Sequence, residues 1–179
     1  MLKKFKLSYN FDFILNTLYK GYSCGATIKF KDQPSLVEDY NVFNGLPKTY
    51  NEHNTLHYRK HWNLKLFNLK NLQSQTGIEI HDVATLIQPP GNTLVAHRDK
   101  HYGSTDKYGD KNYIRTTIFL ENWKVGHILQ YESNNHWTNL SHWEAGDGVM
   151  WDQTHFHLSS NAGFEDKITL QISGIFKEK

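Results

Sequence analysis

The feature that most constrains the fold is a series of short, strand-like runs that begins after Gly77. The runs span residues 78–88, 94–97, 113–121, 128–132, 135–143, 148–151 and 167–176. Residues with turn chemistry separate them, as in a sandwich or barrel. Upstream, residues 56–75 carry apolar side chains at helical spacing, which predicts one amphipathic helix ending at Gly77. Helix first and strands later predict a mainly β fold, a jelly roll with supporting N-terminal helices.

Length and composition set the frame for this fold. We expect 179 residues to form a single domain, with a mixed helical support region at about 1–77 and a jelly-roll core at about 78–176. Cys24 is the only cysteine, and no run is apolar enough for a leader or a membrane span. The prediction is therefore a cytoplasmic protein or, if viral, one in the cytoplasm of the infected cell. The net charge of +2 argues against a nucleic-acid or membrane partner.

The last run alternates between two kinds of side chain, which predicts a strand with two different faces. The apolar series is Ile168, Leu170 and Ile172, and the polar series is Lys167, Thr169, Gln171 and Ser173. Polar groups buried in an ordinary core without partners would be costly. We therefore expect the polar series to line a wet cavity.

Two pairs of His-x-acid type stand out as possible metal ligands. With 11 histidines and 18 acidic residues, about one such pair is expected by chance, so composition alone does not select a site. His97 and Asp99 end a short strand next to a polar loop, where residues i and i+2 can face one ion. The other pair, His142 and Glu144, leaves too little chain downstream for a third ligand on a distant strand. We therefore prefer His97 and Asp99.

The third ligand has two candidates, His155 and His157, which share strand parity. His157 is preferred because Lys167 then follows ten residues later on the next strand. Two imidazoles and one carboxylate form the facial triad of non-haem Fe(II) oxygenases. A buried lysine could hold the remote carboxylate of 2-oxoglutarate, with the hydroxyl of Thr169 beside it. Arg115 is a further candidate for binding an anion, shaping the pocket or contacting substrate.

Four segments together resemble the 2-oxoglutarate/Fe(II)-dependent dioxygenases, and the resemblance covers about residues 78–176. They are residues 97–99, 113–123, 146–152 and 157–174. Within that family, these segments are similar to those of small prolyl 4-hydroxylase-like and aspartyl/asparaginyl hydroxylase-like members. The resemblance implies a double-stranded β-helix, iron on His97, Asp99 and His157, and a basic residue at position 167 that pairs with 2-oxoglutarate.

The predicted activity is hydroxylation of an unactivated C–H bond, with Fe(II), 2-oxoglutarate and O2. The substrate would be a peptide side chain (proline, aspartate or asparagine) or a small molecule. Trp151, Phe156, Phe119 and Tyr131 are candidates for the pocket wall. The loop at 100–112 fits either a substrate lid or a solvated connector. Two alternatives remain: a cupin-like metalloenzyme that uses more histidines and no 2-oxoglutarate, and a jelly-roll binding module without iron.

Overall fold

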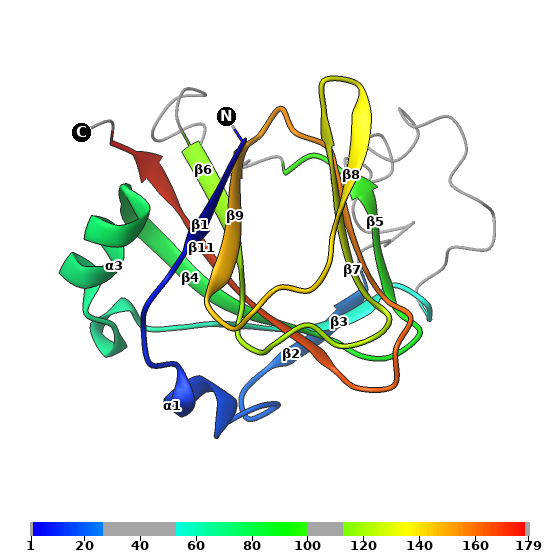
Figure 1. Cartoon of the computed structure of the whole chain (residues 1–179). Coiled ribbons are helices and arrows are strands. Elements are labelled where there is room, and N and C mark those ends of the chain that lie inside the picture. Colours follow the sequence, from blue (N-terminus) through cyan, green and yellow to red (C-terminus); the bar gives the residue numbers. More distant parts are fainter. Residues whose placement is uncertain (1, 27–52, 100–112, 178–179) are drawn as a thin grey trace.

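The computed structural model describes residues 2–26, 53–99 and 113–177, and two antiparallel sheets dominate this part of the chain. The larger sheet has the strand order β1-β9-β6-β11-β4-β3-β2, and the smaller one has the order β5-β10-β7-β8. Figure 1 shows the two sheets facing each other, with the helices outside the larger sheet. The chain is thus mainly β and folds as a double-stranded β-helix, as predicted.

The predicted strand series is confirmed, with small changes at the ends of several runs. The strands of this series are β4 (Ile78–Gln88), β5 (Thr93–His97), β6 (Tyr113–Phe119), β7 (His127–Ser133), β8 (His136–Leu140), β9 (Asp147–Asp152) and β11 (Lys167–Phe176). Strand β10 (His157–Asn161) lies between β5 and β7. The strand spacing after Gly77 was therefore a sound guide to the barrel.

The region before residue 78 contributes strands as well as helices. Strand β1 (Leu2–Lys6) pairs with β9, and β2 (Ser23–Ala26) pairs with β3 (Leu56–His61), which pairs with β4. The short helix α1 (Asp12–Leu15) lies between β1 and β2. Three strands from this region therefore complete the edges of the larger sheet.

The prediction of one helix across residues 56–75 was wrong in its first half. Residues 56–61 form strand β3, followed by a short 3-10 helix, η1 (Leu64–Leu66), and helix α3 (Leu69–Thr76). Hydrogen bonding to neighbouring strands outweighs helical spacing in residues 56–61, because intrinsic propensity is a weak force against tertiary pairing. The predicted stop is confirmed: Gly77 adopts a left-handed φ of 72° and its N–H bonds to the carbonyl of Gln73.

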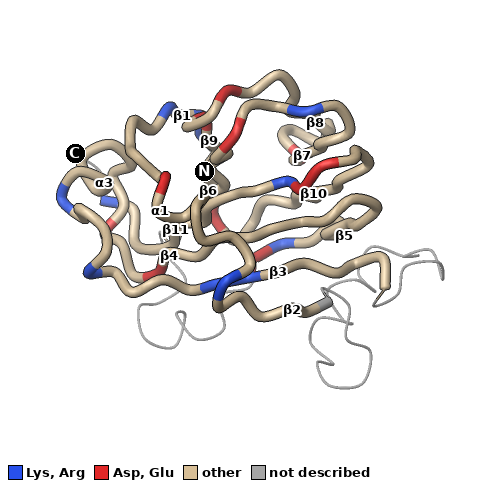
Figure 2. The backbone as a smooth tube through the Cα atoms, turned by 90° about the horizontal axis from the view of Figure 1, so that it is seen from below, with Lys and Arg blue, Asp and Glu red and all other residues tan. Residues whose placement is uncertain are grey.

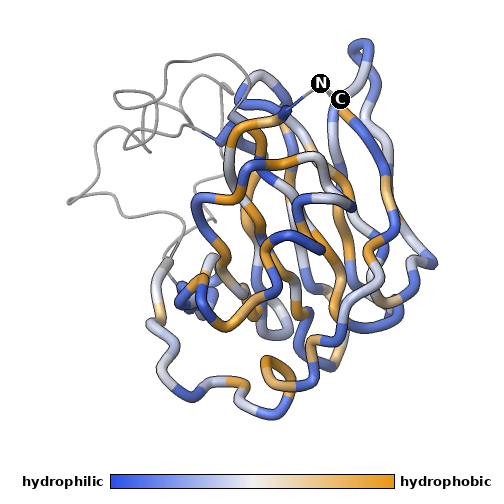
Figure 3. Tube along the Cα trace, turned by 90° about the vertical axis from the view of Figure 1, so that its left-hand side faces the viewer, coloured by the Kyte–Doolittle hydropathy of each residue, from blue (hydrophilic) through white to orange (hydrophobic). Residues whose placement is uncertain are grey.

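The larger of two hydrophobic clusters lies between the larger sheet and the helices. The outward residues of β11, Ile168, Leu170 and Ile172, pack there with residues of α1 and α3 such as Ile14 and Leu72. Figure 3, seen from this side, shows hydrophobic residues alternating with hydrophilic ones along the strands. The opposite face of β11 is thereby turned toward the smaller sheet.

Charge is distributed without a dominant sign. Figure 2 shows basic and acidic residues interspersed along the described backbone. In the described ranges, no helix combines the length and hydrophobicity that a membrane crossing requires.

Candidate metal and anion site

The register of the smaller sheet brings His97, Asp99 and His157 together. His97 ends β5 and His157 begins β10, and the two residues are paired directly across the antiparallel ladder. Their ring centroids are 4.4 Å apart. Asp99 follows two residues after His97, so the same strand end carries both side chains. Residues separated by about sixty positions in sequence therefore converge on one point.

The three side chains have a geometry that suits a metal ion. One potential ligand atom from each of them lies within 4.8 Å of the others. Nε2 of His97 lies 3.8 Å from Oδ1 of Asp99, and Nε2 of His157 lies 3.6 Å from Oδ2. In the parts of the chain that the structure describes, this is the one group of three or more histidine, cysteine or acidic side chains placed in this way.

Backbone carbonyls orient both imidazoles. Nδ1 of His97 lies 2.6 Å from the carbonyl oxygen of Val95, and Nδ1 of His157 lies 3.3 Å from that of His155. An Nδ1–H that donates to a carbonyl leaves Nε2 as the nitrogen with the lone pair. Burial and the nearby His97 lower the pKa of His157 to about 3, so its ring is neutral at neutral pH. Neutral imidazole is the form that binds metals.

Asp99 is buried but strongly compensated. Only 5% of it is exposed, yet it forms an ion pair with Arg115 and accepts a hydrogen bond of 3.0 Å from the indole Nε1–H of Trp151. Burial alone would raise the pKa of this carboxyl, but the charge of Arg115 and the hydrogen bond from Trp151 lower it below its usual range. A carboxylate has about four lone-pair positions. Asp99 is thus ionised and retains acceptor capacity for a metal.

Lys167 lies in the same barrel on β11, with its side chain directed at the smaller sheet. Its Nζ donates to the carbonyl of Ile128 and, at 2.7 Å, to the hydroxyl of Ser159. The residue is only 2% exposed, and none of the described carboxylates forms an ion pair with it. Burial lowers the pKa of Lys167 to about 7. This ammonium group therefore has hydrogen-bond partners but no counter-charge, as an anion-binding lysine would before its ligand arrives.

Aromatic side chains enclose this lysine. Its Nζ lies 5.8 Å from the ring centroid of Trp143, and that ring stacks on Phe119 with centroids 3.7 Å apart. Thr169 is buried on the same strand face, and its cross-strand partners are Phe119 and Leu86. The predicted polar face of β11 therefore turns inward, with Lys167 and Thr169 close together on it.

Arg115 lies at the end of the barrel that carries the His-Asp-His group. Besides its ion pair with Asp99, its Nε donates to the hydroxyl of Ser173 at 3.4 Å. Both contacts hold the guanidinium beside the carboxylate of the triad. Its position therefore suits a role in fixing Asp99.

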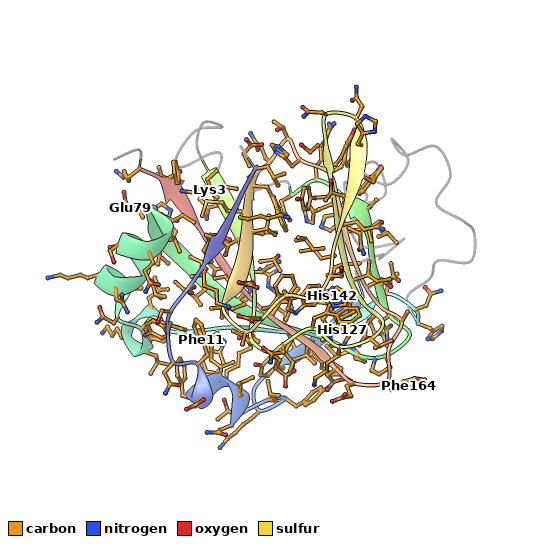
Figure 4. All side chains as sticks on the ribbon, in the orientation of Figure 1. Lys3, Phe11, Glu79, His127, His142 and Phe164 are labelled. Carbon is orange, nitrogen blue, oxygen red and sulfur yellow. The ribbon has the colours of Figure 1, made fainter. Side chains whose placement is uncertain are left out.

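Three further histidines of the described chain lie outside the triad. His155 directs Nδ1 at Asp152 (2.9 Å), and Nε2 of the buried His127 lies 3.0 Å from the carbonyl oxygen of Glu165. His142 is exposed and packs beside Trp123. Figure 4 shows His127 and His142 toward the end of the molecule that carries Phe164. The cupin-like alternative, which would use more histidines, finds no additional ligand for the triad among these three described side chains.

The aromatic residues expected to wall a pocket have several roles. Trp151 is buried, bonds to Asp99 and packs on His157 with centroids 4.3 Å apart. Tyr131 is buried opposite His157 in the ladder. The ring centroid of Phe156 lies 3.8 Å from Cζ of the Arg98 guanidinium. The proposed lid at 100–112 lies outside the described residues.

The sequence reading missed several residues that contact the predicted site residues, and some of them could have been found. Ser159 has the strand parity of His157, so its inward direction follows once β10 is drawn. The bond from Trp151 to Asp99 and the approach of Trp143 to Lys167 link distant strands. No local pattern in the sequence indicates such contacts.

No protein-family model and no curated protein sequence matches this chain. Two solved structures are similar over nearly its whole length. A prolyl-4-hydroxylase from Pseudomonas putida has a TM-score of 0.54 and 14% identity, covering 92% of this chain and 97% of that one. An oxidoreductase of the 2OG-Fe(II) oxygenase family from Burkholderia pseudomallei has a TM-score of 0.52 and 11% identity, covering 97% and 95%. At these identities the similarity is one of fold.

Proposed function

We propose that this chain is a 2-oxoglutarate- and Fe(II)-dependent oxygenase that hydroxylates an unactivated C–H bond. The observation that carries the proposal is the presence, inside one barrel, of a His-Asp-His triad and a buried lysine that lacks a counter-charge. The first suits a ferrous ion and the second suits the remote carboxylate of a dicarboxylic co-substrate. The fold similarity to two proteins of this type supports the same reading.

The donor set fits Fe(II). His97, Asp99 and His157 would hold the ion through two neutral imidazole nitrogens and one carboxylate oxygen, which leaves one side of the metal for other ligands. When bound, the ion would supply the redox chemistry of oxygen with 2-oxoglutarate. The protein's own contribution is to keep Asp99 ionised through Arg115 and Trp151, and to exclude water by aromatic walls.

Lys167 would anchor the far carboxylate of 2-oxoglutarate. Its ammonium group has three donors, which the hydroxyl of Ser159 and backbone carbonyls now occupy. A carboxylate would replace part of these contacts by a charge-assisted bond, and the hydroxyl of the buried Thr169 would lie beside it. The primary substrate would be a peptide side chain or a small molecule in the space that remains.

A first experiment measures succinate release from 2-oxoglutarate in air with added Fe(II). His97→Ala should reduce it by more than about 100-fold, because removing a ligand should cost more than removing an outer partner of one. His142→Ala is the matched control, since this histidine is exposed and lies outside the triad. Wild-type protein that binds iron but never releases succinate would contradict the proposal.

A second experiment separates this function from a metalloenzyme that does not use 2-oxoglutarate. Calorimetry without oxygen should show that 2-oxoglutarate binds only in the presence of metal, and that Lys167→Ala weakens binding by roughly 100-fold, as expected for loss of two charge-assisted bonds. Metal affinity should stay unchanged in this variant. Equal affinity of both proteins for 2-oxoglutarate would rule out Lys167 as the anchor.

A further inference from the structure

Arg59 lies on the inner face of the larger sheet, although the sequence had placed it in a helix. On β3 it pairs with Leu86 of β4, and Leu86 pairs in turn with Thr169 of β11. Side chains in register across neighbouring strands share a face of the sheet. Arg59 is therefore on the same side as Lys167 and Thr169, facing the barrel interior.

The guanidinium of Arg59 has no partner among the described residues. Its Nε is buried without a hydrogen bond, and no ion pair involves this side chain. Burial and the charge of Arg115 lower the pKa of Arg59, which indicates that the two guanidinium groups lie near each other. Removing a cation even partly from water without a counter-charge is costly, so such a group is expected to serve a ligand.

The two carboxylates whose charges act on Arg59 are already engaged elsewhere. The charges of Asp82 and Asp99 both act on Arg59. However, Asp82 lies 2.8 Å from Nδ1 of His61 through its Oδ1, and Asp99 is bonded to Arg115 and Trp151. Neither carboxylate bonds to Arg59. The position thus combines positive potential with an unfilled hydrogen-bonding group.

A second unpartnered group lies on the same face. The amide oxygen of Gln171 is buried and has no hydrogen bond. In the sheet, Gln171 pairs with Ala84, which pairs with His61, so this row is next to the row of Arg59. Ala84, the residue of β4 in the row of Gln171, carries only a methyl group. Two polar side chains, each with a buried atom that lacks a hydrogen bond, therefore lie in neighbouring rows on one face of the larger sheet.

We propose that Arg59 binds a carboxylate of the primary substrate, and that the amide of Gln171 bonds to a polar group beside it. This inference rests on the proposed function, in which Lys167 and the metal take the two carboxylates of 2-oxoglutarate. A third anion-binding group then belongs to the substrate. The planar guanidinium matches a carboxylate. A dianionic phosphate would be repelled more strongly by Asp82 and Asp99. The substrate class is therefore a small molecule or chain terminus that carries a free carboxylate.

The test observes the Nε–H resonance of Arg59 by NMR in protein loaded with Zn(II), a diamagnetic replacement for iron, and with saturating 2-oxoglutarate. Arg59→Lys lacks an Nε–H of this type and so assigns the signal. The probes are N-acetylglycine, its neutral isostere N-acetylglycinamide, and inorganic phosphate. We expect N-acetylglycine to shift the resonance and N-acetylglycinamide to leave it in place.

Affinity measurements on variants complete the test. Arg59→Gln should weaken N-acetylglycine binding by roughly tenfold or more, as expected for loss of a charge-assisted bond. Lys70→Gln removes the same charge from an exposed position of α3 and should change the affinity less than about twofold. Both variants should bind 2-oxoglutarate as the wild type does, which shows that they are folded and that the co-substrate site is intact.

Three results would overturn the assignment while leaving the oxygenase proposal standing. The Arg59 signal could respond to no probe, respond to 2-oxoglutarate alone with no further change, or respond more strongly to phosphate than to N-acetylglycine. Protein that binds no 2-oxoglutarate at all would instead refute the proposed function, and this inference with it.

Discussion

Asp99 and Lys167 are both almost completely buried charged residues of one barrel, but their surroundings differ. Asp99 has a full set of compensating groups, with Arg115 as counter-charge and Trp151 as hydrogen-bond donor. Lys167 has only neutral acceptors. These surroundings have opposite effects on the two charges. The pKa of Asp99 is lowered, which favours the ionised carboxylate. Burial lowers the pKa of Lys167 to about 7, which disfavours the charged ammonium form. The protein supplies a counter-charge for Asp99, whereas none of the described residues supplies one for Lys167.

The sharpest way to break this comparison is to remove the counter-charge of Asp99. Arg115→Met leaves a buried carboxylate unpaired, and breaking a buried pair in this way typically costs about 3–5 kcal/mol. We expect a loss of that size in the free energy of unfolding of the metal-free protein, measured with urea. We also expect metal affinity to fall by about 10- to 100-fold, because Arg115 orients a ligand.

Arg98→Met is the matched control for this variant. Arg98 is the neighbour of Asp99 in sequence, but it is exposed and its guanidinium lies over the face of Phe156. Its loss should cost less than about 1 kcal/mol. Equal stability losses in the two variants would mean that the pairing of Asp99 and Arg115 is not what keeps the carboxylate in place.

The second test uses the pH dependence of the charge on Lys167. A lysine whose pKa is about 7 in the free protein loses its charge as the pH rises above 7. Binding of a carboxylate would raise this pKa again, so the complex takes up a proton. The affinity for 2-oxoglutarate should therefore fall with rising pH above about 7, by up to tenfold per unit.

Lys167→Arg separates this effect from other titrations. Arginine keeps its charge over the whole range, so its affinity for 2-oxoglutarate should be flat between about pH 7 and 9. Calorimetry in buffers of different ionisation enthalpy measures the proton uptake directly. A wild-type affinity that does not change with pH would show that the ammonium group is not the anchor.

The convergence of the His-Asp-His group was easier to predict from sequence than the edge of the larger sheet. His97, Asp99 and His157 carry ligand chemistry in their side chains, and strand parity directs them inward. The alternation of polar and apolar residues along β11 likewise predicted a polar inner face that contains Lys167. Such patterns are local, with a period of two residues, so they can be recognised without knowing which strands pair with one another.

Arg59 illustrates what local pattern could not provide. The residues around Arg59 in β3 show no clear alternation of apolar and polar side chains. The spacing of apolar residues from Trp62 onward resembled that of a helix. Only the pairing with β2 and β4 makes this segment a strand and turns Arg59 inward. The compensation of Asp99 has the same origin, because Trp151 and Arg115 reach it from strands distant in the chain.

The smallest expected effect comes from removing the hydroxyl of Ser159, a neutral hydrogen-bond partner of Lys167. Ser159 accepts a hydrogen bond of 2.7 Å from Lys167, and this bond favours the charged form of the lysine. Ser159→Ala removes about 1 kcal/mol of that support, which corresponds to a further lowering of the lysine pKa by about 0.7 unit. The decline of 2-oxoglutarate affinity should then begin at a correspondingly lower pH. Ser160→Ala is the control, because the Ser160 hydroxyl bonds to Thr93 instead. If both variants move the decline equally, the hydroxyl of Ser159 has no specific influence on the charge of Lys167.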